Sequence, residues 1–215
     1  MVREWRAETS RDRCSGWLLA EHDALADAAR DARWAEVTRV LDDAKGVDVN
    51  GYRIGGTSWF APLHQAAWHG APVEVVDDLR RRGAWLSLPA ADGRTPADVA
   101  RERGHHRLAE VLCPPALDPF VSEDVRGIEA RLRELVDGRR RDGGLDPGVT
   151  MRLPPVAVLA ESGSDGVWMP VSGMYGGFLL RARENHLYVE SWSRMAAGSW
   201  QAHVVTRGAV VVVSG

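Results

Sequence analysis

Four titratable residues near the end of the sequence have the side-chain types that acid–base chemistry needs. They are Tyr175, Glu190, Arg194 and His203. In the segment HLYVESWS, strand alternation puts Glu190 on the same face as Tyr188 and Trp192, and His203 follows in the next strand-like segment. A carboxylate and an imidazole in an aromatic-walled pocket would have pKa values shifted toward neutrality and could transfer protons. The sequence leaves two interpretations open: an acid–base site, or a solvent-facing strand surface with ordinary cross-strand pairs.

The sequence restricts the class of enzyme that such a site would support. It contains no GxSxG motif, no Cys–His pair near a helix start and no cofactor-binding motif. His64 and His69 do not share a helical face, His105 and His106 are adjacent, and none of them belongs to an HExxH motif. We therefore expect no metal and no cofactor, and an enzyme of this kind would be a cofactor-free lyase, isomerase or cyclase.

The composition describes a globular protein of 215 residues with a formal net charge of -3. This charge gives no general attraction to nucleic acid, and no apolar run approaches the length of a membrane span, so neither partner is expected. Cys14 and Cys113 are far apart, which favours two reduced thiols in a cytoplasmic protein. Lys45 is the one lysine among 27 basic residues, a bias typical of a GC-rich, bacterial genome. Each of the nine Trp residues must be covered by the protein itself or contact a partner.

An internal repeat organises the first half of the sequence. Residues 60–85 and 94–112 align on Pro62 and Pro96, which lie 34 positions apart. In each copy Pro begins a short helix, Gly70 or Gly104 ends it, and a second amphipathic helix follows. A weaker first copy at 24–41 has lost both the Pro and the Gly. Between the first two copies, the glycine-containing segment 45–59 predicts an extended finger or a flexible loop.

These copies resemble the ankyrin repeat family over residues 22–113. The clearest copy carries the family pattern at Pro62, Leu63, His64, Ala66, Ala67, Gly70, Val75, Val76, Leu79, Gly83 and Ala84. In the next copy Ala97-Asp98 stands where Leu-His is usual, so the loop hydrogen bonds that the family's His makes are expected to be weaker there. The resemblance implies an all-α array of three repeats, with the first one degenerate.

The resemblance also implies which residues face a target. The target-facing positions are Trp59, Phe60, Trp68, His69, Trp85, Arg94, Glu102 and Arg103. Trp and Arg are enriched at the energetic centres of protein interfaces. A Trp-lined groove would therefore bind a protein partner. The other interpretation is that the 45–59 loop or the C-terminal domain covers these indoles.

The second half of the sequence changes to short β-rich segments. An amphipathic helix is expected at 122–138, with Ser122 as N-cap and Gly138 as stop, followed by a polar linker at 139–148 whose arginines form a solvated helix end. Strand-like segments follow at 155–160, 166–171, 176–183, 186–193, 199–206 and 209–213. They predict an antiparallel meander with one packed helix. This half resembles the C-terminal half of uncharacterised actinobacterial ankyrin-repeat proteins.

The predicted fold class is α+β, with an ankyrin-like array followed by a small antiparallel β domain. The expected organisation is an N-terminal extension at 1–21, repeats at 22–113, a linker and helix at 114–150 and the β domain at 151–215. The leading functional hypothesis is a cytoplasmic protein that binds another protein through the Trp-lined groove. The alternative is the cofactor-free enzyme, with a small-molecule ligand in the β domain or between the domains. Neither hypothesis fixes the partner or the oligomeric state.

Overall fold

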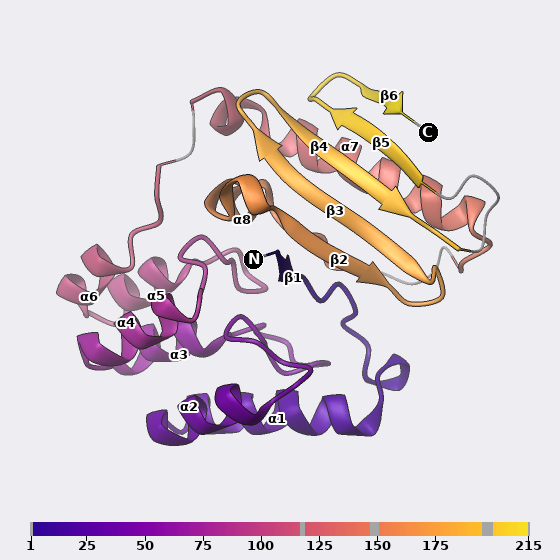
Figure 1. Ribbon diagram of the computed structural model, residues 1–215. Coiled ribbons are helices and arrows are strands. Elements are labelled where there is room, and N and C mark those ends of the chain that lie inside the picture. Colours follow the sequence, from indigo (N-terminus) through magenta and orange to yellow (C-terminus); the bar gives the residue numbers. More distant parts are fainter. Residues whose placement is uncertain (1, 117–118, 147–150, 195–199, 215) are drawn as a thin grey trace. The chain divides into compact units, whose positions relative to one another are not determined.

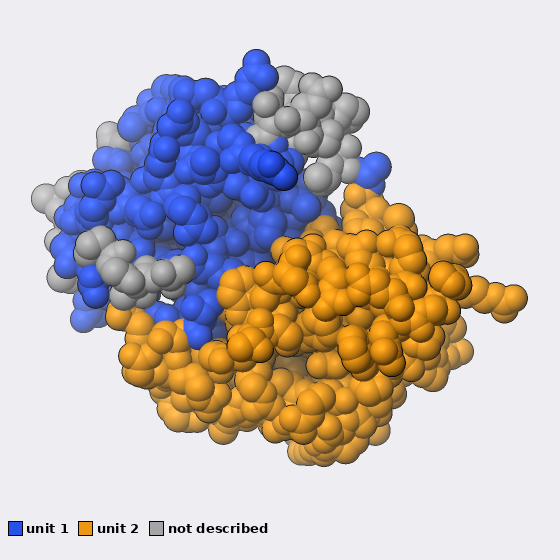
Figure 2. Space-filling view, turned by 180° about the vertical axis from the view of Figure 1, so that it is seen from behind, with its two compact units in different colours: residues 1–9, 116–215 blue, residues 10–115 orange. Residues whose placement is uncertain are grey.

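The computed structural model describes residues 2–116, 119–146, 151–194 and 200–214. Eight α-helices and one six-stranded sheet occur in these residues, which confirms the predicted α+β class (Figure 1). The chain divides into two compact units, which Figure 2 colours separately: Ser10–Pro115, and Met1–Thr9 together with Ala116–Gly215. The N-terminal extension expected at 1–21 is therefore divided between the units. The region expected at 114–150 belongs almost entirely to the second unit, so it is not a separate linker.

The helical unit, Ser10–Pro115, contains three successive helix pairs. After a short 3-10 helix, η1 (Arg11–Arg13), the helices are α1 (Gly16–Arg30), α2 (Trp34–Asp43), α3 (Pro62–His69), α4 (Val73–Arg81), α5 (Pro96–Glu102) and α6 (His106–Val111). Helix α1 starts six residues before the predicted beginning of the repeats, at 22. Leu25, Leu63, Val76 and Leu79 are among the residues that join the pairs in one hydrophobic core.

The same backbone turn ends the first helix of every pair. Ala32, Gly70 and Gly104 have positive φ angles of 54°, 62° and 80°. In each pair the next N–H donates at 2.9 Å to a carbonyl five residues earlier, in Arg33 to Ala28, Ala71 to Ala66 and His105 to Ala100. Left-handed backbone is more costly for alanine than for glycine. The first pair thus adopts the same turn as the other two at a higher backbone cost, because Ala32 stands where they have glycine.

The helix starts of α3 and α5 are also alike. In α3, His64 Nδ1 accepts a hydrogen bond from the Ala61 N–H at 3.3 Å. In α5, Asp98 occupies the equivalent position and accepts from the Thr95 N–H at 3.0 Å and from the Thr95 hydroxyl at 2.7 Å. The expectation of weaker hydrogen bonding at this position is wrong, because Asp98 replaces the family's His as the acceptor and adds the hydroxyl bond.

The 45–59 segment is a packed loop. Val49, Tyr52 and Ile54 are buried, and the Asn50 amide donates to the Gly83 carbonyl at 3.1 Å. This burial favours the finger interpretation over the flexible loop.

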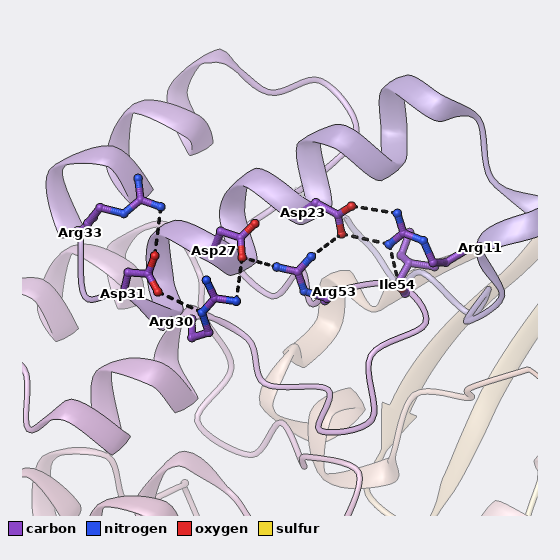
Figure 3. A network of polar contacts seen from close by, with 8 residues as sticks. All are labelled: Arg11, Asp23, Asp27, Arg30, Asp31, Arg33, Arg53 and Ile54. Atoms are coloured by element: carbon purple, nitrogen blue, oxygen red, sulfur yellow. Dashed lines mark hydrogen bonds and ion pairs between the residues drawn. The ribbon is translucent and has the colours of Figure 1, made fainter.

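A chain of charges fastens this loop to α1 (Figure 3). Arg53 reaches from the loop to Asp23, at 2.9 Å, and to Asp27. Arg11 binds the other oxygen of Asp23 at 2.8 Å and donates to the Ile54 carbonyl at 3.1 Å. The hydrogen bond from Arg11 lowers the pKa of Asp23, although partial burial of the carboxylate acts in the opposite direction. These contacts hold the loop in place from outside the core.

The β unit is one sheet with strands in the order β1-β2-β3-β4-β5-β6. Its elements are β1 (Arg3–Glu4), α7 (Pro119–Asp142), α8 (Val156–Glu161), the 3-10 helix η2 (Gly163–Asp165), β2 (Val167–Val171), β3 (Gly176–Arg183), β4 (His186–Trp192), β5 (Trp200–Val205) and β6 (Val210–Ser214). Strands β2 to β6 form the predicted antiparallel meander. Strand β1 pairs parallel to β2, so the sheet is mixed rather than purely antiparallel.

Two predicted elements differ in the structure. The valine-rich segment at 155–160 is helix α8, because Pro155 precedes its first turn and Val156, Val158 and Leu159 are buried within it. Helix α7 continues through Gly138 to Asp142, so residues 139–142 are its last turn and not part of a linker. Ser122 lies inside α7 rather than at its N-cap, since the helix begins at Pro119.

The two faces of the sheet have different environments. Met169, Phe178, Leu180 and Val189 are fully buried on one face, and α7 packs against β4, β5 and β6. The opposite face, which carries Glu190, is only half-buried along β2, β3 and β4. Successive residues of a strand therefore lie in different environments, one buried and the next half-buried.

Candidate functional site

The register between β4 and β5 separates the predicted acid–base pair. His203 is paired with Val189 and Glu190 with Ala202. Cross-strand partners lie on the same face, so His203 is on the buried face and Glu190 on the half-buried face. The two side chains therefore point to opposite sides of the sheet, and they are not within the hydrogen-bond reach that proton transfer between them would require.

The other residues of the predicted acid–base site are also dispersed. Glu190 forms an ion pair with Arg181 of the neighbouring strand. Tyr175 lies in the turn between β2 and β3, with its side chain 72% exposed, and Arg194 is exposed after β4. Two hollows on the β unit, of about 360 and 450 Å³, are lined by other residues than these. Glu190 belongs to a cross-strand ion pair, as the second interpretation expected.

The residues of the helical unit that were predicted to face a target give a different result, because five of them form one group. We call Phe60, Trp68, Arg94, Glu102 and Arg103 the aromatic–arginine cluster. The Phe60 and Trp68 rings meet edge to face, with centroids 6.3 Å apart. The Arg103 guanidinium lies 4.3 Å from the centre of the Trp68 ring, and that of Arg94 lies 5.9 Å from the Phe60 ring. Trp68 is 38% exposed, so its indole is available from outside.

The repeat positions these residues together. Phe60 and Arg94 precede α3 and α5 by two residues, and Trp68 and Glu102 stand at equivalent points near the helix ends. Helices α3 and α5 lie next to each other, so equivalent positions of successive repeats become neighbours. The cluster is therefore a consequence of repeat geometry.

The two arginines of the cluster differ in their charge partners. Arg94 binds Asp92 at 2.7 Å and also pairs with Glu102. Hydrogen bonds to Asp92 and Glu102 raise the pKa of Arg94, and the bond from Arg94 lowers the pKa of Asp92. Arg103 has no carboxylate within salt-bridge distance in the part of the chain that the structure describes. Its guanidinium contacts the Trp68 ring and is exposed, so it is available to an acidic group.

The cluster continues toward the first helix pair through His69. His69 Nε2 lies 2.8 Å from the Arg30 carbonyl oxygen, and its ring meets Trp34 edge to face at 6.3 Å. Sequence reasoning did not include Trp34 or Asp92 in the site. Trp34 begins α2 in the copy whose pattern is weakest, and Asp92 lies outside the positions that the resemblance predicts to face a target.

Two of the residues predicted to line the groove lie outside the aromatic–arginine cluster. Trp85 is only 2% exposed, so the prediction that it faces a target is wrong. The Asn50 side-chain oxygen, in the 45–59 loop, accepts a hydrogen bond from the Trp85 main-chain N–H at 2.9 Å. Trp59 is half-buried, and its ring centre lies 6.2 Å from that of Tyr52 in the same loop. For Trp85, a covered indole is therefore the correct interpretation.

The described residues contain no candidate metal site. Within the ranges that the structure describes, no group of three or more His, Cys, Asp or Glu side chains could hold a metal ion. His64 is fully buried as a helix cap. Within the same ranges, no helix combines the length and apolar character needed to cross a membrane.

Comparison with known proteins gives a partial similarity. No protein-family model matches the chain. A segment of 75 residues, 33% of the chain, is 41% identical to part of the E3 ubiquitin-protein ligase Ufd4 of Drosophila melanogaster. The match covers 2% of that protein, so the chain spans a very small part of its length.

Proposed function

We propose that the helical unit is an ankyrin-type repeat module that binds another protein through the aromatic–arginine cluster. The observation that carries this proposal is the exposed Trp68 indole, with the Arg103 guanidinium stacked on one side and Phe60 at its edge. Tryptophan and arginine supply much of the binding energy at protein interfaces. Their stacking fixes both side chains before a partner arrives, which reduces the entropy lost on binding.

Two further observations support a repeat module. The three helix pairs share one turn geometry, and the first helices of the second and third pairs share the same type of helix start. Proteins built from such pairs use the surface formed by equivalent positions to bind targets. Similarity to a short segment of a much longer protein is also the pattern expected of a module.

The charges of the cluster favour an acidic partner. Arg94 is already balanced by Asp92 and Glu102, whereas Arg103 lacks a carboxylate partner among the described residues. A partner carboxylate next to Arg103 would form a charge-assisted hydrogen bond while an apolar group covers Trp68. The partner segment would thus present an acidic side chain beside an apolar one.

The enzyme alternative receives no support from the geometry. Its four residues are separated by the sheet, by an ion pair and by an exposed turn. For location, we propose a bacterial cytoplasm, since Cys14 and Cys113 do not form a disulfide with each other.

The experiment is affinity capture with single substitutions at the cluster. Full-length protein, Trp68→Ala and Arg103→Ala would be immobilised, and partners from the source organism would be quantified by mass spectrometry. Trp17→Ala is the matched control, because Trp17 is 59% exposed in the same unit but lies outside the cluster.

A specific partner should bind Trp68→Ala at least about 30-fold more weakly than it binds the wild type. It should bind Trp17→Ala and the wild type with equal affinity. Arg103→Lys should fall between wild type and Arg103→Ala, because lysine keeps the charge but loses the planar stack. Equal recovery by all variants would refute the cluster as a binding surface.

A further inference from the structure

Helix α7 places a charged residue where its pattern calls for an apolar one. Ile128, Leu132 and Leu135 are buried on the side of the helix that packs on the sheet. Arg139 follows Leu135 by four positions and so continues the same stripe. The arginine therefore lies over the buried face of the sheet, near the end of the helix.

The Arg139 guanidinium is held by the sheet on one edge only. Its Nε donates to the Ser191 hydroxyl at 3.2 Å. Its Nη2 is inaccessible to solvent and has no hydrogen-bond partner among the described residues. Ser191 lies on the same face as His203, diagonally across β4 and β5. Three polar groups from three elements thus meet at one place.

His203 is a second residue with a buried polar atom whose hydrogen bonding is unsatisfied. The residue is 3% exposed, and its Nδ1 is buried with no hydrogen-bond partner among the described residues. Burial lowers the pKa of His203, the charge of Arg139 lowers it further, and a hydrogen bond to the Val189 backbone acts in the opposite direction. The imidazole is therefore kept neutral beside a permanent cation.

Among the residues that the structure describes, no carboxylate balances this cation. Glu190 is on the other face with Arg181, and Asp137 binds Arg140. None of the described carboxylates lies within salt-bridge distance of Arg139. A half-buried guanidinium with an open donor and no counter-ion is costly, and a bound anion would remove that cost.

We propose that Arg139, Ser191 and His203 form a binding site for the carboxylate group of a small organic acid. One oxygen would accept from Arg139 Nη2 and the other from His203 Nδ1, which would take up a proton as the anion binds. One permanent positive charge matches a monoanion, whereas a phosphate dianion would leave excess negative charge in a poorly solvated place. Arg140 is not needed, since it already binds Asp137 at 3.3 Å and the Asp146 carbonyl at 3.0 Å.

The test is an NMR titration of the full chain with sodium acetate, against sodium chloride at matched ionic strength. Acetate should shift the Arg139 Nε–H and His203 ring resonances in a saturable way and raise the His203 pKa. Chloride should produce only small, non-saturating changes. Sodium phosphate forms a third arm, and saturation by phosphate without saturation by acetate would overturn the assignment to a carboxylate.

Two variants identify the residues responsible. Arg139→Met keeps the apolar stem and should weaken acetate binding at least about tenfold. Arg141→Met is the matched control, because Arg141 is exposed on the same turn and donates only to the Asp137 carbonyl of its own helix. Absence of saturable shifts in the wild type, which needs no variant to fold, would overturn the proposal. Equal shifts in wild type and Arg139→Met would overturn it as well.

Discussion

One arginine of the β unit has surroundings unlike those of three arginines that position a loop and a cluster in the helical unit. In the helical unit, Arg11, Arg53 and Arg94 lie near the surface, and each is within salt-bridge distance of a carboxylate. In the β unit, Arg139 faces the sheet and has no carboxylate partner among the described residues. Surface pairs contribute little to stability, and a buried cation lowers it unless compensated. The surface ion pairs therefore serve to position a loop and a cluster. The buried side of Arg139 is explained better by a bound ligand than by the fold.

The units also differ in how far apart along the chain their contacts are. The helical unit repeats one local turn three times, within residues 28–33, 66–71 and 100–105. The β unit is completed by its most distant segments, since Trp5 lies next to Arg152 and β1 pairs with β2. A substitution in the N-terminal segment should thus affect the sheet, although the helical unit lies between them in sequence.

The largest predicted effect tests this long-range closure. Trp5 is buried, its indole N–H donates to the Arg152 carbonyl at 2.6 Å, and the Arg152 guanidinium lies 4.9 Å from its ring centre. Trp5→Ala should destabilise the β unit by about 3–5 kcal/mol, because it leaves a cavity and an unpaired carbonyl. Hydrogen exchange should show loss of protection in β2 and β3, and unchanged protection in α3 and α5. Trp17→Ala should change stability by less than about 0.5 kcal/mol. Loss of protection in both units alike would contradict the division into two.

A second prediction compares glycines of the two units. A Cβ built on Gly177 would lie 2.3 Å from the Met169 main-chain oxygen, whereas one on Gly93 meets no atom within 4 Å. Gly177→Ala should cost about 3 kcal/mol or more, since the backbone of two strands must separate. Gly93→Ala should cost about 1–2 kcal/mol, because its φ of 87° is strained for alanine. Denaturant unfolding followed separately in each unit measures both. A smaller cost at Gly177 than at Gly93 would show that the strands can adjust.

The contrast between units also explains what could be predicted from sequence. The repeat was visible because Pro62, Gly70 and their equivalents act on the backbone locally. Trp68 and Arg103 contact each other for the same reason, as repeat spacing fixes their neighbours. Their role at a target surface stays a prediction. Strand β1 was missed, since two residues have no pattern of their own and their partner lies more than 160 positions away. Trp85 was misplaced because repeat spacing fixes the position of its backbone but not what buries its side chain.

The β unit shows why alternation alone does not define a site. Alternation correctly divides β4 into two faces, but the relation of those faces to β5 depends on register, and a shift of one residue reverses it. The register places His203 opposite Val189, which separates it from Glu190. Arg139 was assigned to a polar linker because Gly138 precedes it, and the helix tolerates that glycine in its packed last turns.

The third prediction concerns pH and tests the buried histidine directly. The pKa of His203 is lower in the folded protein than the usual value of about 6.5, so the unfolded chain binds protons more readily. Stability should be unaffected by this group above pH about 6.5 and should fall below it, by at most about 1.4 kcal/mol per pH unit, until the folded pKa is reached. His203→Gln should remove this component of the pH dependence. Saturating acetate should reduce it in the wild type, and His69→Gln, an exposed control, should leave it unchanged.

The smallest expected effects compare the arginines themselves. Arg53→Met removes ion pairs to Asp23 and Asp27, but these side chains are more than a quarter exposed, so the loss should be below about 1 kcal/mol and should shrink in high salt. Arg139→Met removes a half-buried cation without a counter-ion and should leave stability unchanged or raise it, without salt dependence. Chemical denaturation at low and high salt would measure both. If Arg139→Met destabilised the protein more than Arg53→Met, the Ser191 contact would hold the fold together. The guanidinium would then be explained by packing of α7 on the sheet, and the contrast between the units would no longer require a ligand.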